Sequence, residues 1–247
     1  MTYCVGLRLK NGLVLMSDTR TNAGVDNISV FRKMFTWTVP GERVITLLTA
    51  GNLATTQSVV SLLNERMKAP EDRNPSILNA PTMFQIAELV SNTLHEVIQS
   101  HSDAGQEASS KFNGTIVVAG QIAGIEHRLF LVYPEGNFVE ASDDTPFFQI
   151  GETKYGKPIL VRAYDPEMTF EDAIKLLLVS FDSTMKANLS VGAPLDLQVI
   201  EKDKLEVSAQ QRIELDDTYF QLISRGWGDA LKEAFKSLPP FNFQEPR

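Results

Sequence analysis

Three side chains in the first part of the chain have the chemistry of a nucleophilic catalyst. The sequence begins Met1-Thr2, and because the second residue is small we expect removal of the methionine, which would leave Thr2 with a free α-amine. The threonine hydroxyl is then the nucleophile. The amine, with an ordinary pKa of roughly 7.7–8.0, is the base that accepts its proton. Asp18 and Lys33 follow, and they are able to form an ion pair.

Each of these residues has a defined role in this hypothesis. Lys33 would favour the alkoxide of Thr2, and its charge would lower the pKa of the amine so that it acts as a base. Asp18 would offset and orient Lys33, because a buried lysine without a partner tends to lose its proton. Gly51, in the segment Ala50-Gly51-Asn52, would direct its backbone N–H at a developing oxyanion.

Every one of these residues also has an ordinary structural interpretation. A threonine at position 2 is common, Asp18 is typical of a turn or cap, and Lys33 beside Arg32 is typical of a solvated surface. Gly51 before a helix is typical of a turn. It is their joint occurrence, in order along a matching strand pattern, that favours the catalytic interpretation.

The strands that must position these residues are predicted by alternation of apolar side chains. A strand over 2–10 leads into Asn11-Gly12, a strong hairpin signal, and a return strand over 13–18. Counting outward from that turn places residue 5 near residue 18, with residue 2 a few positions beyond. A polar loop over 19–29 precedes a third strand over 30–39, which puts Phe31, Lys33 and Phe35 on one face. If these strands are neighbours in one sheet, the catalytic groups meet.

The remainder of the chain alternates between strand and helix patterns. Helical spacing predicts one helix after residue 52 that ends near residue 68, and others over 82–102, 152–164, 169–188 and 216–238. Further strands are expected over 43–49, 112–122, 127–133, 137–141, 195–202 and 205–214, and loops over 69–81 and 103–110. Strands linked as hairpins and segregated from helices predict one α+β domain, over 1–247, in which antiparallel sheets pack together with helices outside.

Composition excludes several classes of function. The net charge of −8 argues against a nucleic-acid partner, because such a partner requires a basic surface. No apolar run approaches the roughly 20 residues of a membrane span, and the N-terminus lacks the pattern of a secretory signal. A single cysteine, Cys4, and three scattered histidines predict neither a disulfide nor a metal site. We therefore expect a cytoplasmic protein with no cofactor and no membrane partner.

The motifs around the catalytic residues carry a resemblance to a known family. They resemble the proteasome β subunits, most closely the bacterial Anbu (ancestral β subunit) branch, in Thr2-Tyr3-Cys4-Val5-Gly6, Ser17-Asp18-Thr19-Arg20, Phe31-Arg32-Lys33 and Leu48-Thr49-Ala50-Gly51. The resemblance extends in element order from residue 2 to about residue 208. It implies a four-layer α-β-β-α sandwich of the N-terminal nucleophile hydrolase type. It also implies amide hydrolysis through an acyl-enzyme on Thr2 and assembly into a homo-oligomeric ring or spiral.

The resemblance also implies further site residues. It adds Arg20, Asn188 and Ser190 to the catalytic set of Thr2, Asp18, Lys33 and Gly51. The family has an aspartate where this chain has Asn188, and an amide cannot supply the negative charge beside the Thr2 amine. The nearest match to a Ser-Gly element of the family is Gly151-Glu152-Thr153. The first specificity pocket is expected to be apolar and to prefer a hydrophobic residue before the scissile bond, with lining from Thr21, Phe31, Phe35, Thr49 and Leu53.

Three functions remain open from the sequence. The first is a threonine peptidase that acts on peptides or unfolded protein, and the second is an amidase with the same nucleophile on a small-molecule or isopeptide substrate. The third is a non-catalytic ring scaffold, which Asn188 favours and the retention of Thr2, Asp18 and Lys33 disfavours. Removal of Met1 is the only processing we expect, and without it the Thr2 nitrogen is an amide. The helix and tail over about 216–247 are predicted to serve assembly, and the sequence identifies no docking motif for an ATPase.

Overall fold

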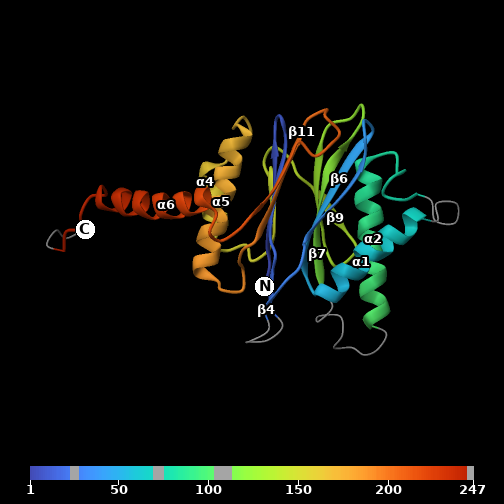
Figure 1. Ribbon diagram of the computed structural model, residues 1–247, viewed down its shortest axis with the longest axis horizontal. Helices are drawn as coiled ribbons and strands as arrows, with labels where there is room; N and C mark the ends of the chain where they lie inside the picture. The colour runs from blue at the N-terminus through green and yellow to red at the C-terminus, as the bar shows by residue number, and fades with distance from the viewer. Residues whose placement is uncertain (23–27, 69–74, 103–112, 244–247) are drawn as a thin grey trace.

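The computed structural model describes residues 1–22, 28–68, 75–102 and 113–243. Two five-stranded antiparallel sheets face each other between two layers of helices (Figure 1). The predicted four-layer α-β-β-α sandwich is confirmed. The predicted loop over 103–110 and much of the predicted loops over 19–29 and 69–81 lie outside the described residues.

The first sheet has the strand order β10-β1-β2-β11-β12. Its bounds are β1 Tyr3–Leu9, β2 Gly12–Asp18, β10 Phe147–Gly151, β11 Leu195–Glu201 and β12 Ala209–Ile213. Helices α4 (Lys157–Ala163) and α5 (Phe170–Ala187) cover its outer face (Figure 1). Thr169 caps α5, since its side chain accepts a hydrogen bond from the Asp172 N–H at 3.1 Å.

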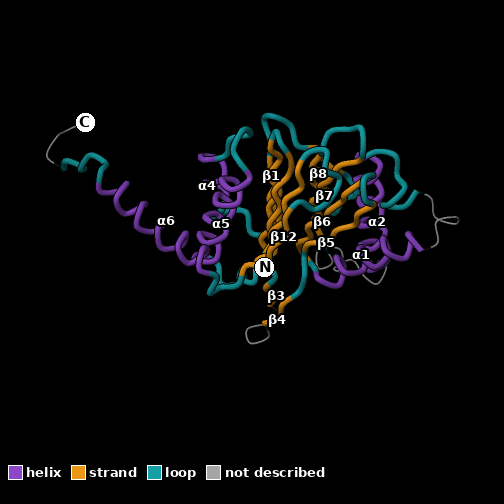
Figure 2. Tube along the Cα trace, turned by 45° about the horizontal axis from the view of Figure 1, so that its top comes forward, coloured by secondary structure: helices purple, strands orange, loops and turns teal. Residues whose placement is uncertain are grey.

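The second sheet has the order β5-β6-β7-β8-β9 and is covered by α1 and α2. Its bounds are β5 Met34–Val39, β6 Arg43–Gly51, β7 Gly114–Ile122, β8 Arg128–Val132 and β9 Phe138–Glu140, with α1 Leu53–Lys68 and α2 Met83–Ser102. A separate two-stranded ribbon, β3 (Arg20–Asn22) with β4 (Ile28–Val30), extends beyond the end of the sandwich (Figure 2).

Apolar side chains fill all three spaces between the layers. Strand β1 contributes side chains to two of these spaces, because successive side chains point to opposite faces of a sheet. Tyr3 packs toward α5, and Cys4 packs between the sheets. The third cluster lies between the second sheet and its helices and includes Leu63, Leu94 and Phe130. Burial of each such side chain contributes about 1.5–3 kcal/mol. Strand β1, which follows Thr2, and strand β2, which ends at Asp18, are therefore held on both faces.

Helix α6 (Thr218–Lys236) projects away from the body (Figures 1 and 2). Phe220 is its one buried residue. Ile223 and Trp227 are half-buried, and the large apolar side chains closer to the tail are exposed: Leu231, Phe235, Leu238, Phe241 and Phe243. None of the described helices has the length and apolar character that a membrane span requires.

Several predicted details are wrong. The hairpin pairs Val5 with Met16, not with residue 18, because the turn lies one residue earlier than we expected, at Lys10-Asn11. The third strand begins at Met34, so Lys33 precedes it, and this strand belongs to the second sheet. Strands β3, β4 and β10 were not predicted. Helix α4 covers only 157–163 of the 152–164 expected, since Pro158 favours a start at the first helical turn.

Candidate functional site

A cavity of about 520 Å³ opens at the end of the sandwich where Thr2 lies. The N-terminal segment, the end of β6 and the start of α1 form most of its wall, and the end of β10 closes one side. The lining residues are Met1, Thr2, Thr21, Lys33, Thr49, Ala50, Gly51, Asn52, Leu53, Thr56 and Gly151. The cavity thus joins both sheets, and it contains the predicted nucleophile together with Lys33 and Gly51.

Asp18 is the buried centre of the hydrogen bonds around this cavity. One carboxylate oxygen accepts from Lys33 Nζ at 2.7 Å and from the Tyr3 N–H at 3.0 Å, and the other accepts from the Gly192 N–H at 3.3 Å. Burial raises the pKa of the Asp18 carboxyl, and the charge and hydrogen bond of Lys33, with the two N–H donors, act in the opposite direction. Asp18 thereby fixes the first residues of β1 to Lys33.

Lys33 directly precedes β5 of the second sheet, and its side chain reaches Asp18 at the end of β2 in the first sheet. Its ammonium also donates to the Arg20 carbonyl at 2.6 Å, and its own carbonyl accepts from the Thr49 N–H at 2.9 Å. The Lys33 side chain is 5% exposed. A lysine so deeply buried requires its anionic partner, because desolvation disfavours an isolated charge. The pair with Asp18 therefore sets a positive charge at the floor of the cavity.

Thr2 is held by the end of β10. Its carbonyl accepts a hydrogen bond from the Glu152 N–H at 2.6 Å. Gly151 has φ of +83°, and a Cβ there would lie 2.0 Å from the Thr2 carbonyl oxygen, so only glycine permits this approach. With Met1 in place, the free amine belongs to that residue. Its pKa is lowered by desolvation first and by Lys33 second, against opposing effects of Asp18 and Glu152.

Gly51 ends β6 with φ of +112°. A Cβ there would lie 2.4 Å from the Asn113 carbonyl oxygen and 2.9 Å from the Gly114 Cα. The Thr49 N–H donates to the Lys33 carbonyl, and the N–H two positions later in a strand points to the same side. Because β5 begins at Met34, which pairs with Leu48, no residue of β5 lies opposite Gly51, and the Gly51 N–H is directed toward the cavity that Gly51 lines.

The end of α5 reaches the same region. Asn188 caps the helix, and its Nδ2 donates to Glu152 Oε2 at 2.9 Å while its Oδ1 accepts from the Ser190 N–H at 3.0 Å. Arg20 Nη1 donates to the Leu189 carbonyl at 3.0 Å. Asn188, Ser190 and Arg20 thus meet at the end of α5, where Asn188 contacts Glu152, and all three lie outside the cavity lining. Glu152 was noted in the sequence only as part of a motif and was predicted to lie in a helix. No local signal places it beside Thr2, because that position depends on the pairing of β10 with β1.

The predicted specificity residues divide into two groups. Thr21, Thr49 and Leu53 line the cavity, together with Ala50. Phe31 and Phe35 do not line it: Phe31 lies at the surface before β5, and Phe35 is half-buried within β5, opposite Leu47. The reason is the late start of β5, which moves both rings away from the face where alternation had put them.

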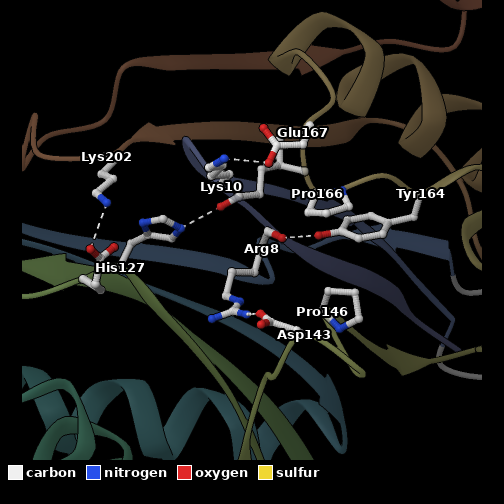
Figure 3. A pocket seen from close by; sticks show the side chains of 11 residues that line it. Arg8, Lys10, His127, Asp143, Pro146, Tyr164, Pro166, Glu167 and Lys202 are labelled. Carbon is white, nitrogen blue, oxygen red and sulfur yellow. Dashed lines mark hydrogen bonds and ion pairs between the residues drawn. The ribbon is translucent and has the colours of Figure 1, made fainter.

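A second hollow, of about 460 Å³, lies at the opposite end of the sandwich around the β1–β2 turn (Figure 3). Three ion pairs line it: Arg8–Asp143 at 2.5 Å, Lys10–Glu167 at 2.8 Å and Lys202–Glu126 at 2.8 Å. A ring nitrogen of the buried His127 lies 2.8 Å from the Leu9 carbonyl oxygen, and burial lowers the pKa of this histidine. The cations have carboxylate partners, and the hydroxyl in the lining, that of Tyr164, donates to the Arg8 carbonyl. The Thr2 cavity is therefore the stronger candidate.

Comparison with known proteins decides the family. A family model described as "Proteasome subunit" matches residues 2–200. The chain belongs to the proteasome subunit family. Among solved structures, Anbu (ancestral beta-subunit) from Yersinia bercovieri is 46% identical with a TM-score of 0.91, and 98% of this chain matches 100% of that one. The Anbu (Gly-1) mutant from Hyphomicrobium sp. strain MC1 is 49% identical with a TM-score of 0.90, at 98% and 100% coverage.

Further members of the family match as well. The proteasome subunit beta of Methanocaldococcus jannaschii is 27% identical over 86% of this chain and 87% of its own length. The helical assembly of the Anbu complex from Pseudomonas aeruginosa contains a chain 45% identical to this one, with a TM-score of 0.90 and coverage of 99% and 100%. The identities place this proteasome-family chain in the Anbu branch, as the motifs around Thr2 predicted.

Proposed function

We propose that this chain is a threonine peptidase whose nucleophile is Thr2, exposed by removal of Met1. The observation that carries the proposal is the buried Lys33–Asp18 ion pair, 2.7 Å long, beside the cavity that Thr2 and Gly51 share. Membership of the proteasome family supports a peptidase as the reaction class. We place the protein in the cytoplasm, as its composition suggested.

The reaction follows from the residues of the cavity. Thr2 Oγ attacks the carbonyl carbon of the scissile amide while its proton passes to the Thr2 amine. The Gly51 N–H stabilises the resulting oxyanion, and the charge of Lys33 favours the alkoxide. The amine then returns the proton to the leaving nitrogen, and the C–N bond breaks to give an acyl-enzyme. A water molecule, deprotonated by the same amine, hydrolyses the ester and restores Thr2.

Intact mass measurement before and after incubation with a hydrophobic peptide epoxyketone tests this proposal. The reagent requires a hydroxyl and a free amine on one residue. We expect loss of Met1 and one adduct per chain, and no adduct on a Thr2→Ala variant. A chain that keeps Met1, or a processed chain without an adduct on a panel of peptides, would contradict the proposal.

We also propose that α6 and the tail join copies of this chain into a homo-oligomer. The support is the row of exposed apolar side chains beyond Phe220 and the helical assembly of the related Pseudomonas aeruginosa complex. An exposed apolar surface of this kind is typical of an interface. The substrates of such an assembly would be peptides or unfolded protein, and an ATPase partner is left open.

Deletion of residues 239–247 is expected to shift the protein to smaller species. The deletion removes Phe241 and Phe243, which are 65% and 91% exposed and pack on each other with ring centroids 4.8 Å apart. Light scattering after size-exclusion chromatography gives the mass. Deletion of 244–247 alone is the control, because it leaves both rings in place. An unchanged mass for the longer deletion would disprove the role of the tail.

A further inference from the structure

Glu152 is a buried carboxylate at the edge of the active-site region. It is 7% exposed. Its two oxygens accept from neutral donors, the Asn188 amide at 2.9 Å and the Lys154 N–H at 3.3 Å. In the part of the chain that the structure describes, Glu152 forms no ion pair. A buried carboxylate in this state is costly, so the arrangement calls for a positive charge close by.

Glu152 is also tied to the nucleophile through the backbone. Its N–H donates to the Thr2 carbonyl at 2.6 Å, directly after the glycine whose missing Cβ allows the approach. The charges that influence the pKa of the N-terminal amine are those of Lys33, Asp18 and Glu152, each from a different segment. Lys33 and Asp18 compensate each other at 2.7 Å. Among the three charged groups that influence the pKa of the N-terminal amine, Glu152 is therefore the one that forms no ion pair in the described structure.

Asn188 fits this arrangement as a donor. A carboxylate at position 188 would meet Glu152 at hydrogen-bond distance, and two carboxylates so close cannot both be ionised at low cost. The amide Nδ2 instead donates to Glu152, while Oδ1 is fixed by the Ser190 N–H. The end of α5 thus holds the carboxylate of Glu152 in one orientation.

We propose that Glu152, oriented by Asn188, is the anion that positions the α-amine of Thr2 and sets its protonation. The proposal rests on the proposed function in one respect, namely that removal of Met1 exposes this amine. Glu152 would hold the ammonium form by charge attraction, and Lys33 would oppose it. The negative charge that position 188 lacks is supplied from the end of β10.

The test is a titration of the Thr2 amine that does not require turnover. Protein without Met1, treated with methionine aminopeptidase where needed, is methylated reductively for a short time at a series of pH values. Mass spectrometry of the N-terminal peptide then gives the extent of methylation at each pH, and the midpoint of this titration curve reports the pKa of the Thr2 amine. We expect Glu152→Gln to lower this midpoint by about one pH unit, because loss of the negative charge disfavours the ammonium. Glu126→Gln, at the far end of the sandwich, is the control and should leave the midpoint unchanged.

Exchange of the two side chains separates charge from structure. Glu152→Gln/Asn188→Asp keeps an amide and a carboxylate in contact, and we expect its midpoint to return toward that of the parent. Asn188→Asp alone, with two carboxylates in contact, is expected to lower the melting temperature, and the exchanged pair should recover it. If Glu152→Gln changes the melting temperature but not the midpoint, Glu152 is only structural and the proposal is wrong. A shifted midpoint in protein that no epoxyketone modifies would support this proposal while the peptidase proposal fails.

Discussion

Replacement of Lys33 by methionine is expected to lower the free energy of unfolding by about 3–5 kcal/mol and to reduce peptide hydrolysis at least about 100-fold. The loss of stability follows because Asp18, fully buried, would keep a charge without its partner. The loss of activity follows because the positive charge that favours the Thr2 alkoxide is gone. Urea denaturation and kcat/KM on a peptide substrate measure the two effects.

The double variant Asp18→Asn/Lys33→Met separates these effects. It removes both charges, so much of the stability should return, since replacing both members of a buried pair is far less costly than breaking it. Activity should stay low, because the ammonium is still absent. If Lys33→Met alone unfolds at the same urea concentration as the parent, the ion pair does not contribute as we infer.

Replacement of Gly51 by alanine is expected to reduce kcat/KM about 100–1000-fold, the usual effect of losing one oxyanion donor. An added Cβ would lie 2.4 Å from the Asn113 carbonyl oxygen, and φ of +112° is unfavourable for alanine. The end of β6 must therefore shift, and the N–H with it. Peptide hydrolysis on the folded variant, checked by circular dichroism, gives the measurement.

Gly41→Ala is the matched control. Gly41 also has positive φ, +72°, but no atom lies within 4 Å of an added Cβ. Alanine there introduces backbone strain of about 1–2 kcal/mol without a clash and far from the cavity. We expect lower stability with unchanged kcat/KM. Equal losses of activity in the two variants would show that strain, and not the position of the Gly51 N–H, is responsible.

Local patterns in the sequence predicted most of the elements and the family. The apolar period of α2 and α5 and the alternation of β1 were sufficient, because their burial depends on residues close in sequence. Strand β10 was missed, because the short run Phe147–Gly151 has no clear alternation of apolar and polar residues. Its partner is β1, more than a hundred residues earlier, and no local signal encodes such pairing.

The difference between local sequence patterns and long-range pairing also decides how much of the site could be predicted. Thr2, Asp18, Lys33 and Gly51 were predicted from their order, and the structure places all four in or beside one cavity. Their meeting depends on the packing of two sheets, whereas the prediction had used neighbouring strands of one sheet. Glu152 could not be recognised as an acid of the site, because its proximity to Thr2 depends on the β1–β10 pairing.

The positions of the two chain ends restrict how this protein can be labelled. An affinity tag before Thr2 would prevent formation of the free amine, and a tag after residue 247 would follow the helix and tail that we assign to assembly. Gly124, in the exposed turn between β7 and β8, has φ of +80° and open space around it. An epitope inserted there would leave both Thr2 and helix α6 in their native form, so that activity and assembly could be measured on the same labelled protein.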